Sequence, residues 1–188
     1  MLINRLRHVL HLKHIDYQNI PIIIYNDNNF DSLRNIISAL EDRGYRNIYV
    51  IDDSSTSQAV LDYYQTLNHK VFFPKEGKGY NLLWNTPQIF SIFKDSYYVY
   101  TNSIFEIKDS FPKNFVSSLF NTIKKYPTCD RVGIKSDFKI NDAGSRDLIS
   151  NNIFRSFVSD EFAIYAPFAD GIKGYGHFSL EITDNFLP

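Results

Sequence analysis

Sulfur is almost absent from this chain, which has one cysteine and one methionine in 188 residues. Because a disulfide needs two cysteines, the single Cys129 excludes an intramolecular disulfide framework and fits a reducing compartment. An excess of charge is also lacking: 20 basic and 21 acidic side chains give a formal net charge of −1. Nucleic-acid-binding domains usually carry a clustered basic face, so this balance argues against a nucleic-acid partner.

Long hydrophobic runs are missing as well. No stretch of about 18 apolar residues occurs, so the sequence predicts no transmembrane helix. Arginine, histidine and lysine interrupt the first twenty residues, unlike the apolar centre of a secretory signal. We therefore expect a cytoplasmic protein, and contact of the N-terminal segment with a membrane surface stays open.

Aromatic side chains, by contrast, are abundant. Phenylalanine, tyrosine and tryptophan make up 16% of the chain, which predicts a bulky core or a stacking surface. A chain of this length buries roughly 70% of the surface that its unfolded form exposes, enough for one domain. We expect a loosely helical extension at 1–19 and a single domain at 20–188.

Short apolar runs alternate with amphipathic segments from residue 21 onward. The continuous β-branched run "PIIIYN" is typical of a strand that is buried on both faces. Strands are predicted at 21–26, 46–55, 69–74, 97–102 and 131–136, and helices at 26–45, 57–68, 82–93 and 112–127. After residue 140 the alternation stops, and we expect one extra strand at 159–167 and a glycine-spaced segment at 168–179.

Strand–helix alternation with short links predicts an α/β fold, in which a mostly parallel sheet is covered by helices on both faces. Such sheets bind ligands at the carboxyl ends of their strands. The places to inspect are therefore Tyr25–Asn28, Asp52–Ser55, Lys75–Asn81 and Thr101–Glu106.

Four segments carry a resemblance to a known family: "PIIIYNDNNFDSLRNIISALEDRGYRNIYVIDDSST", "GKGYNLLWN", "YYVYT" and "DEFAIY". In this order they resemble GT-A-fold glycosyltransferases, most closely a family-2-like bacterial and viral branch that acts on nucleotide sugars. The resemblance covers residues 21–165. It implies a Rossmann-like nucleotide-binding half at 20–106 and an acceptor-binding half at 107–188.

The resemblance also implies roles for residues at the strand ends. It makes Asp52 the partner of a uracil or ribose edge, a contact that a charge-assisted hydrogen bond would strengthen. The alternative is that Asp52 caps the helix that begins near Ser55. Gly77 and Gly79 would let the backbone approach the nucleotide, or simply form a turn. The nucleotide-binding residues implied in this way are Tyr25, Asn26, Asp52, Asp53, Ser54, Gly77, Gly79, Asn81, Thr101 and Asn102.

The chain departs from the family at the end of the fourth strand. Members usually have Thr-Asp-x-Asp there, and the carboxylates hold the ribose side and a divalent metal that stabilises the leaving diphosphate. This chain has "TNSI" at 101–104, so the usual ligands of Mn²⁺ or Mg²⁺ are missing. Glu106 and Asp109 are displaced candidates for a metal site.

Without a metal, basic side chains would have to stabilise the leaving group. Lys173 and His177 in "GIKGYGHF" are the best placed for a closing clamp, and the other basic candidates are Lys135, Arg146 and Arg155. Trp84 either lies in the core or contacts the sugar. An inverting transferase also needs a base for the acceptor hydroxyl, and the resemblance places it at Asp160 or Glu161.

The resemblance therefore implies a glycosyltransferase of polysaccharide biosynthesis. Its donor would be a nucleotide sugar, with UDP expected, and its acceptor a glycan or a glycosylated carrier. The alternative is a catalytically inactive relative that binds nucleotide or serves as an assembly partner, and an oligomer or larger assembly stays open. A nucleotidyltransferase is a more distant alternative, because it would want a basic, glycine-rich loop after the first strand, where this chain has "YNDNNF".

Overall fold

The computed structural model describes residues 16–75, 79–126, 129–135, 148–150, 153–156, 162–169 and 178–183. The first half contains η1 (Tyr17–Asn19), β1 (Ile22–Asn26), α2 (Phe30–Asp42), β2 (Ile48–Asp52), α3 (Gln58–Thr66), β3 (Lys70–Phe72), α4 (Leu82–Asn85), α5 (Pro87–Phe93) and β4 (Tyr98–Asn102). The second half contains α6 (Phe115–Lys125), β5 (Cys129–Lys135), β6 (Leu148–Ser150), β7 (Ile153–Ser156), β8 (Phe162–Tyr165) and β9 (Phe178–Thr183). The predicted N-terminal helix falls largely on residues 1–15, outside the described part.

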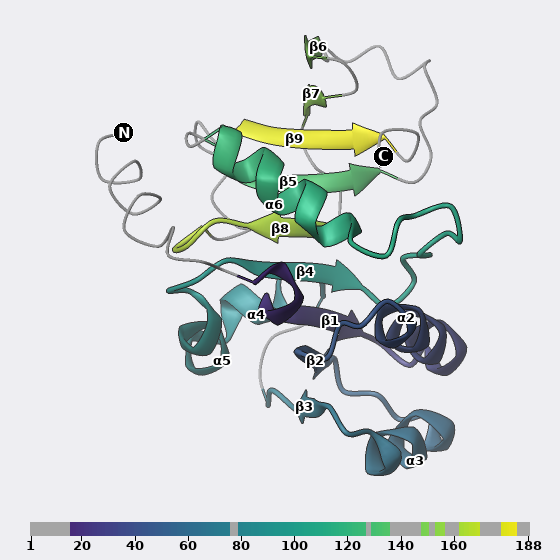
Figure 1. The fold of residues 1–188 in the computed structure, drawn as a ribbon. Coiled ribbons are helices and arrows are strands. Elements are labelled where there is room, and N and C mark those ends of the chain that lie inside the picture. The colour runs from purple at the N-terminus through teal and green to yellow at the C-terminus, as the bar shows by residue number, and fades with distance from the viewer. Residues whose placement is uncertain are drawn as a thin grey trace.

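One sheet runs through the molecule in the order β3-β2-β1-β4-β8-β5-β9-β7-β6 (Figure 1). The first four strands are parallel to one another, as the strand–helix alternation predicts. The α/β class and the covering of the sheet by helices are confirmed. Within the described residues, no helix is long and apolar enough to cross a membrane.

Beyond β4 the sheet is mixed. The predicted extra strand is present as β8, and it pairs antiparallel with both β4 and β5. Strand β9 then pairs parallel with β5, and the β6–β7 hairpin extends the sheet through β7. The sequence did not predict β6, β7 or β9.

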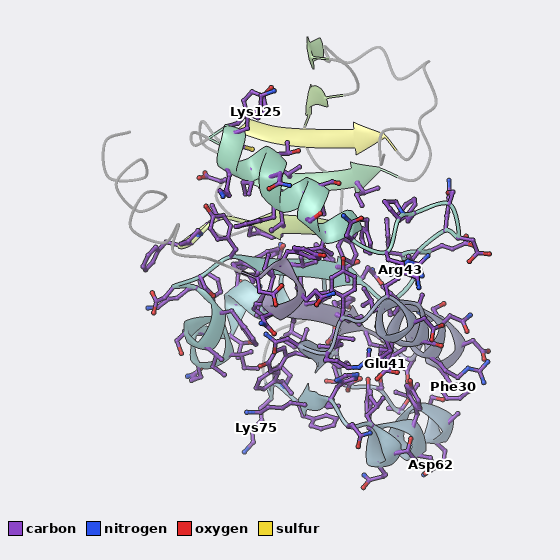
Figure 2. All side chains as sticks on the ribbon, viewed as in Figure 1. Phe30, Glu41, Arg43, Asp62, Lys75 and Lys125 are labelled. Carbon is purple, nitrogen blue, oxygen red and sulfur yellow. The ribbon has the colours of Figure 1, made fainter. Side chains whose placement is uncertain are left out.

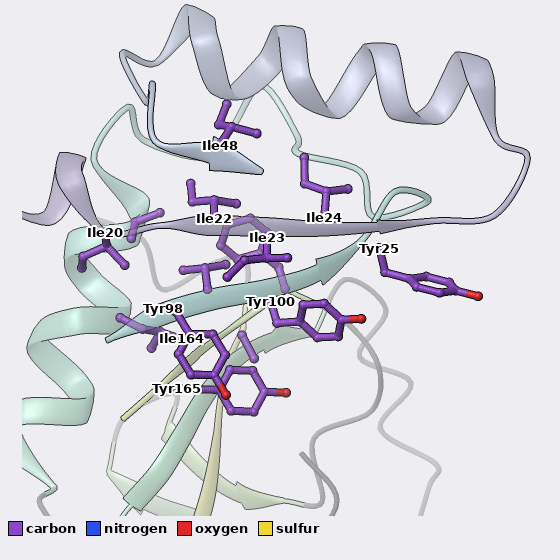
Figure 3. Close-up of a cluster of buried hydrophobic side chains, with 14 of the residues drawn as sticks. Ile20, Ile22, Ile23, Ile24, Tyr25, Ile48, Tyr98, Tyr100, Ile164 and Tyr165 are labelled. Atoms are coloured by element: carbon purple, nitrogen blue, oxygen red, sulfur yellow. The ribbon is translucent and has the colours of Figure 1, made fainter. Parts of the chain in front are cut away.

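Strand alternation decides which side chains meet which helices. Figure 3 shows Ile22, Ile24 and Ile48 on the side of helix α2, with Tyr98 and Tyr100 on the other side of the sheet. The register agrees, because Ile22 pairs with Ile48 in β2. Every residue of β1 is buried, so this strand is covered on both faces, as its continuous β-branched run predicts.

Helix ends follow local chemistry. The single helix predicted at 82–93 is two helices, since Pro87 keeps the preceding Thr86 out of the helical region, with φ −116° and ψ 83°. Gly44 follows α2 with φ +89°, as its predicted role at the end of that helix requires. Arg43, beside it, lies against the loop that follows β4 (Figure 2) and donates to the carbonyl oxygens of Ala39 (2.9 Å) and Lys108 (3.0 Å).

Candidate functional site

The carboxyl ends of β1, β2 and β4 lie next to one another at one edge of the sheet. Asn26 is paired with Asp52 of β2, and Tyr25 is paired with Asn102 of β4. Because successive side chains of a strand point to opposite faces, Asn26 and Asp52 share the face covered by α3. Tyr25 and Asn102 share the face covered by α4.

Asp53 joins three segments at this edge. Its Oδ2 accepts the hydroxyl of Tyr25 at 2.7 Å and the backbone N–H of Gly79 at 2.6 Å. The half-buried carboxylate therefore ties the end of β2 to β1 and to the loop that precedes α4. Burial, and then the hydrogen bond to Asp53, raise the pKa of Tyr25 above its ordinary value, so this phenol remains a donor at neutral pH.

Asp52 has a different environment, in which it is only 2% exposed. Its Oδ1 accepts the hydroxyls of Ser55 (2.5 Å) and Tyr64 (2.6 Å), and its Oδ2 accepts the backbone N–H of Ser55 (2.8 Å). The Tyr64 hydroxyl in turn accepts from Nδ2 of the fully buried Asn26 at 3.0 Å. This carboxylate fixes the turn before α3. It does not cap that helix, the alternative considered for it, because the N-cap is Ser57; the nucleoside contact stays a prediction.

Two residues with left-handed backbone shape the loops at this edge. Ser54, in the turn after the two aspartates, has φ +58° and Asn28 has φ +55°, values that are uncommon outside glycine. The side-chain oxygen of Asn28 accepts the N–H groups of Thr56 (2.7 Å) and Ser57 (2.9 Å). The loop after β1 thereby satisfies backbone donors that precede α3.

The glycine loop is described from Gly79 onward, and Gly77 lies outside the described residues. Gly79 has φ +77°, a conformation that glycine adopts without strain. Its carbonyl accepts the N–H of Leu82 at 2.9 Å, so the residue forms the turn that opens α4. Asn81 is exposed at the N-terminal boundary of α4.

Aromatic rings fill the space between this loop and the sheet. Tyr80 lies 4.8 Å from Tyr100 and 5.9 Å from Tyr25, measured between ring centroids. Trp84 is 7% exposed, and its indole N–H donates to the hydroxyl of Tyr98 at 2.9 Å. Trp84 is therefore part of the core beneath the loop, the first of the two roles considered for it.

The "TNSI" segment at 101–104 forms a turn that is held by hydrogen bonds to Asn102. Oδ1 of Asn102 accepts the N–H of Ile104 at 3.1 Å, and the carbonyl of Asn102 accepts the N–H of Phe105 at 3.1 Å. Thr101 is fully buried, and Ile104 is 63% exposed. The turn presents an amide and an aliphatic side chain, not the two carboxylates that the sequence resemblance would place there.

Among the residues that the structure describes, those at this turn do not fit a divalent cation. Hard cations want several oxygen ligands, chiefly carboxylates, and Glu106 and Asp109 are both exposed in the loop after β4. No group of three His, Cys, Asp or Glu side chains comes together anywhere in the described part of the chain. The four remaining candidates, Asp160, Glu161, Lys173 and His177, lie outside the described residues, as does Arg146; of Lys135 and Arg155 only the backbone is described.

Sequence reasoning missed Tyr64, which holds Asp52 and Asn26 together. Its signal was present: Val60 and Tyr64 are four residues apart and both are buried in α3. A tyrosine on the apolar face of a helix needs a partner for its hydroxyl. Burial, and then the hydrogen bond to Asp52, raise the pKa of Tyr64.

No protein-family profile matches the chain, and no curated protein sequence matches it either. Solved structures do match. TarS from S. aureus (residues 1–349) has a TM-score of 0.51 and 17% identity, over 79% of this chain and 47% of that one. Two structures of HddC from Yersinia pseudotuberculosis match, one with a TM-score of 0.54 and one, complexed with GMP-PN, with a TM-score of 0.53. Both HddC structures are 12% identical over 87% of this chain and 89% of theirs. At these identities the likeness establishes the fold.

Proposed function

We propose that the chain is a glycosyltransferase that moves a sugar from a nucleotide-diphosphate donor to a hydroxyl on a glycan or glycosylated carrier. UDP-sugars are the expected donors. The proposal is supported by the GT-A-like strand-end motifs and by a fold shared with TarS and HddC, the latter solved with GMP-PN. The observation that carries it is the Asp53 carboxylate, which is oriented at the carboxyl edge of the sheet by Tyr25 and Gly79.

In this proposal Asp53 takes the nucleoside contact that the resemblance assigned to Asp52, because Asp52 is 2% exposed and accepts three hydrogen bonds within the protein. A carboxylate has about four acceptor sites on its two oxygens, and Tyr25 and Gly79 both donate to Oδ2. An imide N–H or a ribose hydroxyl of the donor would donate to Oδ1 in a charge-assisted hydrogen bond. Asp52 supports this arrangement from the opposite face of the sheet by fixing the turn.

We infer transfer without a resident metal, and the turn at Asn102 supports this because it presents no carboxylate. The leaving diphosphate gains negative charge as the sugar departs, and a positive group must stabilise it. Lys173 and His177 supply that charge in the proposal, while Asn102 lies on the ribose side. Asp160 or Glu161 accepts the proton of the acceptor hydroxyl as the new glycosidic bond forms.

Thermal unfolding of the purified chain with nucleotides tests the proposal. UDP, GDP, CMP and UDP-sugars would each be added with Mn²⁺, with Mg²⁺ and with a chelator. A ligand at 100 times its Kd adds about 2.7 kcal/mol to the free energy of unfolding. We expect a shift with UDP that survives the chelator and is lost in Asp53→Asn. The absence of a shift with every nucleotide would contradict the proposal.

The second candidate is a catalytically inactive nucleotide-binding or assembly protein. The exposed Ile104 favours it, because an aliphatic side chain occupies a position where the family has a metal ligand. Release of UDP from UDP-sugars, measured with and without glycan acceptors, separates the two. Binding of UDP without turnover of any sugar in the panel would favour the inactive protein.

A further inference from the structure

Phe73 is an exposed aromatic ring at the carboxyl edge of the sheet. Its side chain is 59% exposed, and it directly follows the last residue of β3. The other large apolar side chains found exposed in the described residues are Ile92 (54%), Ile104 (63%) and Phe168 (39%). A single exposed apolar residue is ordinary, so its position and surroundings carry the argument.

The register of β3 places this residue beside Asp52 at the carboxyl edge of the sheet. Phe72 pairs with Ile51 of β2, so Phe73 follows one residue later, next to Asp52. Adjacent strands are about 4.8 Å apart. The ring lies on the α3 face of the sheet with Asp52 and Tyr64, whereas Asp53, directly after the last residue of β2, bonds to Tyr25 and Gly79 on the other face. A ligand that contacts both Phe73 and Asp53 therefore lies across the carboxyl ends of β2 and β3.

Phe73 is also held in place. Its ring centroid lies 5.6 Å from that of Tyr64, with an interplanar angle of 76°. The Tyr64 hydroxyl is fixed between Asp52 and Asn26. Pro74 follows Phe73, and its ring limits the backbone at that point. A flat apolar surface backed by a fixed aromatic ring is already arranged for stacking.

We propose that Phe73 is the stacking residue for the base of a bound nucleotide. This inference rests on the proposed function and assigns a specificity-determining residue to the same site. Every nucleobase presents an aromatic face that can stack on a phenyl ring. Asp53, one strand away and on the other face of the sheet, accepts a hydrogen bond from the base or ribose at the strand ends. The two contacts, one from each face, together fix the orientation of a nucleoside that lies across the edge.

Affinity for UDP, measured by calorimetry in a Phe73 series, tests the inference. Removal of a stacking ring typically weakens binding by roughly 5- to 150-fold, so we expect a loss in that range for Phe73→Ala. Phe73→Tyr keeps a ring and should bind within about threefold of the wild type. Phe73→Leu keeps apolar surface without a flat face and should bind much more weakly than Phe73→Tyr.

Ile92→Ala is the matched control, because Ile92 is equally exposed but lies in α5, between β3 and the start of β4. It should leave UDP affinity unchanged. Phe73→Trp adds an indole to a chain whose one tryptophan is buried, and UDP should quench the added emission. Equal UDP affinity in the wild type and Phe73→Ala, or in the Leu and Tyr variants, would overturn the stacking role alone. Failure of the wild type to bind any nucleotide would overturn both proposals.

Discussion

The hydroxyl of Tyr64 donates to Oδ1 of Asp52 over 2.6 Å and joins helix α3 to the end of strand β2. Asp52 is a buried carboxylate, and buried charged groups need hydrogen-bond partners to be tolerated. Asp53, the next residue, is half-buried and bonded to Tyr25 and Gly79 on the other face. Two adjacent acids thus have separate tasks, one inside the fold and one at its edge.

Tyr64→Phe removes the donor to Asp52 and the acceptor of Asn26 without removing the ring. Leaving buried polar groups unpaired costs about 1–3 kcal/mol, so the free energy of unfolding should fall by that amount. Urea unfolding measures it. Tyr63→Phe, on the half-buried neighbour in the same helix, should change stability by less than about 0.5 kcal/mol. Equal losses in both variants would contradict the role of Tyr64.

Asparagine substitutions separate the two aspartates. Asp52→Asn removes a buried charge that accepts three hydrogen bonds, and we expect a loss of stability of about 1–3 kcal/mol. Asp53→Asn should keep most of the free energy of unfolding and should weaken UDP binding instead. Thermal unfolding and UDP calorimetry on both variants check this. The reverse pattern would assign the nucleoside contact to Asp52.

Alkaline pH should destabilise the fold through buried phenols. Burial raises the pKa of Tyr97 to about 12, from an ordinary value of 10.0. Since the folded state holds this proton more tightly, the stabilisation is complete below about pH 10 and is lost as the pH rises towards 12. Urea unfolding between pH 8 and 11.5 should show a shallower decline for Tyr97→Phe than for the wild type. Parallel curves would contradict the assignment.

Substitutions at Gly79 measure the cost of its left-handed backbone conformation separately from the cost of a steric clash. A Cβ at this position would meet no atom within 4 Å, and φ is +77°. Gly79→Ala should therefore cost about 1–2 kcal/mol from the left-handed conformation alone. Gly79→Asn should cost less, since asparagine tolerates this region better. Urea unfolding of both variants gives the comparison, and an equal cost would point to another cause.

Restoring two carboxylates to the turn after β4 should create a metal response. In the double variant Asn102→Asp/Ile104→Asp, the exposed position of Ile104 means that no core volume is lost. We expect Mn²⁺ to raise UDP affinity at least about tenfold, or 1.4 kcal/mol. Asn102→Asp alone is the control with one added carboxylate. If Mn²⁺ does not change the UDP affinity of the double variant, the turn cannot present both carboxylates to a metal ion.

Local patterns were enough for the first half of the sheet. The run Ile22–Tyr25 is buried on both faces and is therefore apolar throughout. Such a continuous run is visible in the sequence without knowledge of the strands that pair with it. Pro87 split a predicted helix, because the effect of proline on Thr86 outweighed an apolar pattern that continues through it.

The second half could not be predicted to the same depth. The place of β8 between β4 and β5, and of β9 beyond them, depends on pairing between segments far apart in the chain. At the site, the tasks of Asp52 and Asp53 depend on where the strand ends and on the left-handed Ser54 that follows. A serine gives no such signal in the sequence, whereas a glycine would have done so.

Strand β8 lies far downstream of β4 in the chain, so one edge of β4 stays unpaired during part of synthesis. The outer edge of β4 is covered by Phe162–Tyr165, more than fifty residues downstream. A ribosome adds about 5–20 residues per second. The parallel strands β1–β4 therefore have an unpaired hydrogen-bonding edge for several seconds. Such edges template association between chains. Premature termination before Phe162 should therefore yield a product that depends on chaperones and aggregates when they are depleted.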